Sequence, residues 1–163
     1  MTTYIGIDPG LQGAVAIIQS VGVVIIDTPT MQVKKGKGKK TEYLPIEMAE
    51  VLIAYPGCQV FIEKLHSMPG QGVSSSFRLG EGYGLWVGIV SALKLPLTKV
   101  TPQAWKKVMM AGLADKDSAR GRAQELFPGV AHLLKRKKDC DRADALLLAE
   151  YGRRSCGDIA VRF

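Results

Sequence analysis

The chain has 163 residues, of which 47% are hydrophobic, and its 22 Lys and Arg outnumber its 15 Asp and Glu. This length predicts a single domain over residues 1–163 with one sizeable core, and the net charge of +7 favours nucleic acid over a membrane surface as the partner. No apolar stretch approaches the roughly 20 residues of a spanning helix, and the first residues lack the basic start and apolar segment of a signal peptide. We therefore expect a cytoplasmic protein that does not contact a membrane.

The three cysteines, Cys58, Cys140 and Cys156, are widely spaced and form no Cys-x-x-Cys pair. Neither a disulfide framework nor a zinc site is supported, so reduced thiols are expected. Cys140 lies between Asp139 and Asp141, where a small residue that fills space is the plainer interpretation.

Three short, β-branched segments open the chain and are separated by turns that carry glycine. Residues 3–8, 14–19 and 23–27 are therefore predicted to form an antiparallel meander of three strands. The stretch near residues 32–43 contains five lysines interleaved with glycine. It is too polar and too flexible to pack in a core, so we expect an exposed basic loop.

A helix over residues 45–54 and a strand over residues 59–63 come next, as the apolar spacing indicates. Because a helix precedes this strand, a crossover connection is expected to place it parallel to the first strand. Side chains alternate between the two faces of a strand, so Asp8 and Glu63 can project to the same side. A cleft shared by these two carboxylates is geometrically available.

A long helix is predicted over residues 74–93, with Gly80, Gly84 and Gly88 on one side of it. Each glycine costs a helix about 1 kcal/mol relative to alanine. Their repetition therefore predicts that this side packs closely on the sheet, on another helix or on a ligand, with the sheet preferred.

The last third of the chain is predicted to hold a strand over residues 97–100 and several helices. Thr101 caps the first of these helices with Pro102 at its first position, and Asp115 or Asp117 opens the next one. The closing helix covers residues 141–151, where Asp141 and Asp144 lie about 60° apart on one face. Asp139 would lie about 200° around the helix, so it is interpreted as a cap or a solvated residue.

Four carboxylates can thus converge on one cleft of a basic chain: Asp8, Glu63, Asp141 and Asp144. They would repel one another unless divalent cations neutralised them, and oxygen-rich sites suit magnesium or manganese. An acidic metal pocket in a basic protein fits the cleavage of a phosphodiester backbone. The alternative, that these acids are caps and surface charges, stays open.

Three motifs occur in an order that resembles the RuvC family of Holliday junction resolvases, within the ribonuclease H-like superfamily. They are Gly-Ile-Asp-Pro-Gly at 6–10, Ile-Glu at 62–63 and Asp-x-x-Asp-Ala-Leu at 141–146. The segments at 76–80 and 102–107 also resemble family helices. The resemblance implies an α/β fold with a five-stranded mixed sheet of order 3-2-1-4-5, flanked by helices on both faces.

The same resemblance implies a homodimeric endonuclease that resolves four-way DNA junctions. Paired symmetrical nicks would leave 5′-phosphate and 3′-hydroxyl ends. The four carboxylates would hold two Mg²⁺ ions about 3.5 to 4 Å apart, with Mn²⁺ able to substitute. No nucleotide cofactor is expected, and the small size suits a phage-encoded enzyme that acts in the host cytoplasm.

Basic residues near these motifs are candidates for DNA contact. Lys106 and Lys116 lie where family members place lysines that touch backbone phosphate, although a solvated charge is an even alternative for each. His66 lies where some relatives have an aromatic residue that wedges against bases. Arg136 and Lys137 belong to the basic run that precedes the acidic pair and could clamp the strand.

Other functions remain compatible with the sequence. One is a nuclease for RNA–DNA hybrids or other branched DNA, and another is a DNA-binding module without catalysis. A sugar-kinase or actin-like phosphotransferase shares the Gly-Ile-Asp-x-Gly loop, but two lobes and a second phosphate loop do not fit this length.

Overall fold

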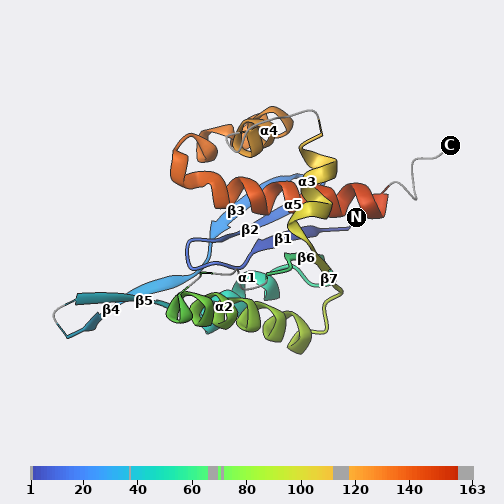
Figure 1. Cartoon of the computed structure of the whole chain (residues 1–163). Helices are drawn as coiled ribbons and strands as arrows, with labels where there is room; N and C mark the ends of the chain where they lie inside the picture. Colours follow the sequence, from blue (N-terminus) through green and yellow to red (C-terminus); the bar gives the residue numbers. More distant parts are fainter. Residues whose placement is uncertain (1, 37, 66–69, 71, 112–117, 158–163) are drawn as a thin grey trace.

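The structure, a computed structural model, describes residues 2–36, 38–65, 70, 72–111 and 118–157 (Figure 1). Its centre is a mixed five-stranded sheet in which β1 pairs antiparallel with β2 and parallel with β6. The spatial order is β3-β2-β1-β6-β7, which confirms the predicted order 3-2-1-4-5. The strands are β1 Tyr4–Asp8, β2 Ala14–Gln19, β3 Gly22–Asp27, β6 Gln59–Glu63 and β7 Leu97–Val100.

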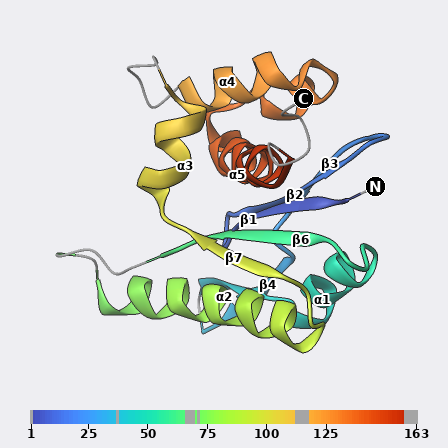
Figure 2. The ribbon, with the colours of Figure 1, turned by 90° about the vertical axis from the view of Figure 1, so that its right-hand side faces the viewer.

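Helices cover both faces of this sheet, as predicted. Figure 2 shows α5, α3 and α4 on one face and α1 with α2 on the other, and a separate hydrophobic core fills each side. No helix in the described ranges is long and apolar enough to cross a bilayer. The helices are α1 Pro45–Ile53, α2 Val73–Ala92, α3 Pro102–Met109, α4 Ser118–Leu126 and α5 Cys140–Gly157, with short 3-10 turns η1 Pro128–Leu134 and η2 Lys137–Asp139.

The backbone of α5 rests directly on β1 at Gly6. A Cβ atom at Gly6 would overlap the carbonyl oxygen of Ala145 and the amide nitrogen of Ala149. Only glycine on the strand and small residues on the helix allow such a close approach. The contact therefore fixes the height of α5 above the sheet.

The basic segment near residues 32–43 is mostly exposed, as predicted, but the prediction of an irregular loop is wrong, because the segment forms a β-hairpin. β4 Thr30–Lys35 and β5 Gly38–Tyr43 pair antiparallel with Thr30 opposite Tyr43 and Lys35 opposite Gly38. The prediction equated polarity with irregular structure. A ribbon that is exposed on both faces needs no apolar face, and its backbone groups are satisfied by pairing between the strands.

The prediction that Gly80, Gly84 and Gly88 mark close packing is also wrong. A Cβ atom at any of the three would meet nothing within 4 Å among the described residues. The tight glycine of α2 is Gly82, where a Cβ atom would overlap the hydroxyl of Tyr43 and the carbonyl oxygen of Pro9.

The capping residue of α3 was predicted correctly, whereas the role of Asp139 in the turn before α5 was predicted only in part. Thr101 Oγ1 accepts a hydrogen bond from the Ala104 amide at 3.3 Å, which confirms the cap. Asp139 accepts from the Arg136 amide at 2.8 Å, so it does cap a turn, but it is buried rather than solvated. The predicted helix start at Asp115 or Asp117 lies outside the described residues.

Alanine substitutions in α2 will separate the tight glycine from the open ones. Gly82→Ala should lower the free energy of unfolding by about 1 to 3 kcal/mol, because the new methyl group is forced against Tyr43 and a backbone carbonyl. Gly84→Ala, the matched control, should raise it by up to about 1 kcal/mol, because the position is open and alanine favours the helix. Urea denaturation measures both, and equal effects at the two positions would contradict the packing described.

Candidate functional site

Two carboxylates lie at one edge of the sheet. Asp8 is the last residue of β1 and Glu63 the last of β6. These strands are parallel and in register, with Ile7 opposite Ile62, so Asp8 and Glu63 follow at the same level. The sheet thus places both acids side by side, as the strand alternation predicted.

The first two turns of α5 add Asp141 and Asp144 to this edge. Burial, followed by repulsion from the carboxylates of Asp141, Glu63 and Asp144 in that order, raises the pKa of Asp8 from 3.8 to about 8. A carboxyl group responds in this way only to charges in its immediate surroundings. The structure therefore brings the four predicted acids into one electrostatic cluster, which we call the acidic cluster.

The pKa values of Asp144 and Asp141 are raised as well. The pKa of Asp144 is raised to about 6, mainly by burial, with Lys106 opposing the shift and Glu63 and Asp141 adding to it. The ammonium nitrogen of Lys106 lies 4.0 Å from Asp144 Oδ2, and its side chain is about half exposed. Burial also raises the pKa of Asp141, and the Cys140 thiol, which donates to Asp141 Oδ1 at 3.3 Å, partly opposes that shift.

Trp105 is a site residue that the sequence analysis missed. It is fully buried, and its indole Nε1 donates to Glu63 Oε2 at 2.8 Å. A buried indole N–H needs an acceptor, so a tryptophan beside a predicted site lysine was the available signal. The bond holds Glu63 in one orientation at the edge of the sheet.

The acidic cluster fits a hard divalent cation by its chemistry. Its ligand atoms would all be carboxylate oxygens, which suit Mg²⁺ or Mn²⁺, and its members disfavour one another's ionised forms. Within the described ranges, no three Asp, Glu, His or Cys side chains stand close enough together to ligate one ion. Instead each acid faces a donor of the chain: Asp8 the Gly10 amide, Glu63 Trp105, Asp141 Cys140 and Asp144 Lys106.

The residues predicted to contact DNA differ in their surroundings. Lys106 lies at the acidic cluster, and Lys137 is exposed in η2. Arg136 is bound by both oxygens of Asp139, and its guanidinium is the main reason why the pKa of Asp139 is below its ordinary value. His66 and Lys116 lie outside the described residues.

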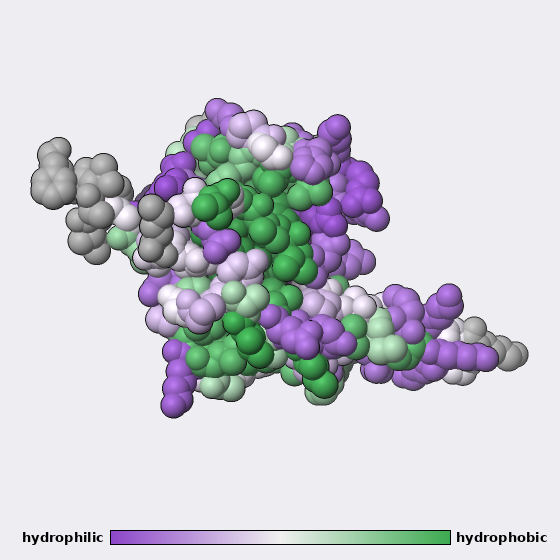
Figure 3. All heavy atoms as spheres, turned by 180° about the vertical axis from the view of Figure 1, so that it is seen from behind, coloured by the Kyte–Doolittle hydropathy of each residue, from purple (hydrophilic) through white to green (hydrophobic). Residues whose placement is uncertain are grey.

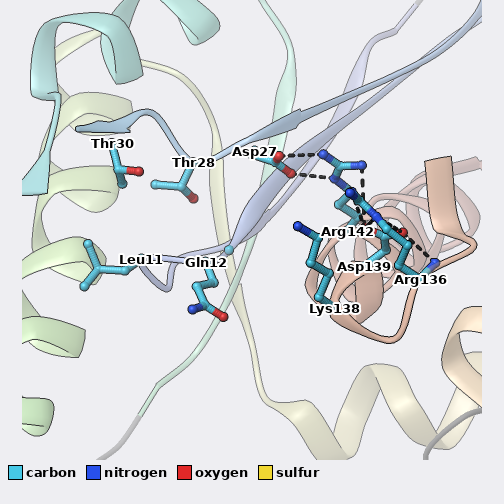
Figure 4. Close-up of a pocket in the computed structure, with 10 residues that line it drawn as sticks. Leu11, Gln12, Asp27, Thr28, Thr30, Arg136, Lys138, Asp139 and Arg142 are labelled. Carbon is cyan, nitrogen blue, oxygen red and sulfur yellow. Dashed lines mark hydrogen bonds and ion pairs between the residues drawn. The ribbon is translucent and has the colours of Figure 1, made fainter. Parts of the chain in front are cut away.

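A pocket of about 330 Å³ lies beside this basic run, next to the turn that follows Asp8 (Figure 4). Arg142 lines it and forms a bidentate pair with Asp27, at 2.5 Å for each bond (Figure 4). This pair joins the end of β3 to the first turn of α5. The lining residues drawn in Figure 4 are Leu11, Gln12, Gly13, Asp27, Thr28, Thr30, Arg136, Lys138, Asp139 and Arg142.

Comparison with known proteins identifies the fold of the chain. No protein-family model matches the chain. Over 97 residues it is 29% identical to Holliday junction resolvase MOC1, chloroplastic, of Chlamydomonas reinhardtii, a match that takes in 59% of this chain but 11% of that protein's length.

Solved structures match nearly the whole chain. T. thermophilus RuvC in complex with Holliday junction substrate superposes with a TM-score of 0.63 at 13% identity, over 99% of this chain and 97% of that one. The chain has a RuvC-like fold. The Thermus thermophilus RuvC structure gives 0.56 at 17% identity over 95% and 97% of the two chains, and the yeast mitochondrial Holliday junction resolvase Ydc2 gives 0.53 at 14% over 97% and 80%.

The resemblance inferred from three short motifs is therefore confirmed. In the RuvC-like fold of this chain the motifs occupy the end of β1 with the turn after it, the end of β6 and the first two turns of α5. The assignment of the four acids as metal ligands stays a prediction.

The raised pKa of Asp8 predicts a pH dependence of stability in the absence of divalent ions. The unfolded chain releases this proton near pH 4, whereas the folded RuvC-like chain holds it until about pH 8. Between these values the unfolded state binds fewer protons, so this group makes the free energy of unfolding fall as pH rises. Urea denaturation in EDTA should show a steeper fall for the wild type than for Asp8→Asn.

The exposed acid Glu47 of α1 provides the control, since Glu47→Gln removes a carboxylate outside the acidic cluster and should leave the wild-type slope in place. Parallel pH profiles for wild type and Asp8→Asn would show that Asp8 is not held in the protonated form.

Proposed function

We propose that this RuvC-like chain is a metal-dependent endonuclease that resolves four-way DNA junctions. The acidic cluster carries the proposal, since four carboxylates from β1, β6 and α5 form one electrostatic unit at the edge of the sheet. The relatives support it: one RuvC structure is a complex with Holliday junction substrate, and MOC1 and Ydc2 are named Holliday junction resolvases. The net charge of +7 suits a polyanionic partner.

Asp8, Glu63, Asp141 and Asp144 would hold the metal, which we take to be a pair of Mg²⁺ ions with Mn²⁺ able to substitute. When bound, such ions activate water and stabilise the charge that develops on a phosphate under attack. The proton that Asp8 holds near neutral pH would leave as metal binds, because a metal ligand must be deprotonated, and below about pH 6 the same holds for Asp144. Metal binding should therefore release protons and strengthen with pH.

The remaining residues of the site have roles that follow from their contacts. Trp105 fixes the orientation of Glu63 through the indole N–H. Lys106, half exposed beside Asp144, provides a positive charge at the entrance of the acidic cluster, where a backbone phosphate would lie. Arg136, Lys137, Lys116 and His66 remain proposed DNA contacts further out, and a homodimer would supply the two opposed nicks.

Removing one predicted ligand will test the function. With Mg²⁺, the wild type should nick a four-way junction symmetrically and leave linear duplex and RNA–DNA hybrid intact. Asp8→Asn should lower cleavage by more than about a hundredfold, because it removes a ligand charge, while junction affinity stays equal or rises because the basic surface is unchanged.

Denaturing gels of end-labelled strands give the nick positions, and gel shifts give the affinity. Glu47→Gln is the control for loss of an unrelated acid and should cut normally. Preferential cutting of the hybrid would replace the proposal with a hybrid nuclease, and binding without cutting would leave a DNA-binding module.

The indole of Trp105 provides a second test. Trp105→Phe keeps an aromatic ring in the core but removes the donor to Glu63, so the Mn²⁺ or Mg²⁺ concentration that supports half-maximal cleavage should rise about 10- to 100-fold. Junction affinity in EDTA should not change.

Trp86→Phe is the matched control. Trp86 is equally buried, and its indole N–H finds no partner among the described residues, so its loss should leave the metal response as in the wild type. If both variants responded alike, the bond from Trp105 to Glu63 would have no part in metal binding.

A further inference from the structure

The β4–β5 hairpin leaves the sheet at the edge that carries the acidic cluster. In the sheet ladder Asp8 is opposite Ala14, and Ala14 is opposite Asp27, the last residue of β3. β4 begins three residues later, at Thr30. Figure 1 shows the hairpin extending away from the body of the molecule at this edge, and six residues per strand give it a reach of about 20 Å.

The root of the hairpin is anchored and the rest of it is exposed. Tyr43 is buried in a core, and its hydroxyl donates to the carbonyl oxygen of Arg78 in α2 at 3.3 Å. The Leu44 amide donates to the Pro29 carbonyl at 3.0 Å and closes the base. Apart from Tyr43, no described hairpin residue belongs to a core, so the arm is fixed in direction but free along its length.

The hairpin is strongly basic on both faces. The sequence has five lysines between residues 34 and 40, and the single acid of the hairpin, Glu42, is paired with Lys40 at 3.0 Å. Strand alternation places Lys34 and Lys39 on one face and Lys35 and Lys40 on the other. Figure 3 shows the projecting arm as largely hydrophilic.

This charge arrangement opposes the stability of the free hairpin. Lys34 is directly opposite Lys39, and like charges in that position destabilise a strand pair. An isolated two-stranded ribbon is only marginally stable. A row of anions along the arm would remove the repulsion, whereas a second copy of the same arm would add to it.

We propose that the β4–β5 hairpin binds a duplex arm of the DNA by lying in its major groove, with lysines of the two faces against the phosphates of the two strands. The major groove is about 12 Å wide and admits a two-stranded ribbon. Each base pair adds about 3.4 Å to the length of a duplex, so a hairpin with a reach of about 20 Å would cover about six base pairs from the acidic cluster. This inference rests on the proposed function, because the duplex arm is taken to be one arm of a four-way junction. The hairpin itself would contact only the duplex.

Neutralising the four described lysines tests the proposal: Lys34→Ser, Lys35→Ser, Lys39→Ser and Lys40→Ser in the full chain. Affinities for a junction with long arms and for a linear duplex are measured over a range of salt. The slope of log K against log salt should fall in magnitude by about 2 to 4, because each lost phosphate contact removes about 0.9. Arginine at the same four positions is the control and should retain the wild-type slope.

Neutral methylphosphonates at about three to six base pairs from the nick position locate the contact. They should weaken binding by the wild type and leave the serine variant unaffected. Thermal unfolding checks that the serine variant folds, and removing the Lys34–Lys39 repulsion should not lower its midpoint.

The outcomes separate this inference from the proposed function. If the wild type binds and cuts the junction but the serine variant has the same affinity and salt slope, the hairpin proposal alone fails. If hairpin-dependent duplex binding is found without junction cleavage, the hairpin proposal stands and the proposed function fails. If the methylphosphonates weakened binding by the wild type and by the serine variant equally, the hairpin proposal would also fail, since another part of the chain would then bind those phosphates.

Discussion

The approach of the α5 backbone to β1 at Gly6 decides where the carboxylates stand. Gly6 and Asp8 share one face of the strand, and Ala145, which Gly6 accommodates, is adjacent to Asp144. A side chain at Gly6 would lift the helix and carry Asp141 and Asp144 away from the sheet. One missing Cβ atom thus sets the separation between the rigid pair on the strands and the pair on the helix.

Holding four acids together is unfavourable, and the surrounding residues offset only part of that cost. Burial and mutual repulsion raise the pKa of Asp8 to about 8 and of Asp144 to about 6, so Asp8 retains its proton near neutral pH. Gly10, Trp105, Cys140 and Lys106 each face one acid, but three of these four donors carry no charge. A divalent cation would supply the positive charge that these residues lack.

The sequence predicted those parts of the fold whose signals are local. Alternating β-branched segments gave the meander, the crossover helix gave the parallel β6, and Thr101 with Pro102 gave the start of α3. The features that were predicted wrongly or missed depend on contacts with residues far away in the sequence. Gly82 is distinguished from Gly84 only by Tyr43 and Pro9, and the role of Trp105 depends on Glu63, 42 residues earlier. The hairpin was missed because its strands pair with each other and not with a core.

The same distinction explains how the site is assembled. Asp8 and Glu63 are held by ladder pairing that strand patterns encode, whereas the position of the helical pair depends on contacts between segments far apart in sequence. Arg142, next to Asp141, is bound at 2.5 Å to Asp27, and the hairpin begins three residues after Asp27, at Thr30. The ion pair lowers the pKa of Asp27, so it persists across the neutral range. The N-terminal half of α5 is therefore held to the sheet at Gly6, and its first turn is held by Arg142 to the strand that leads into the hairpin.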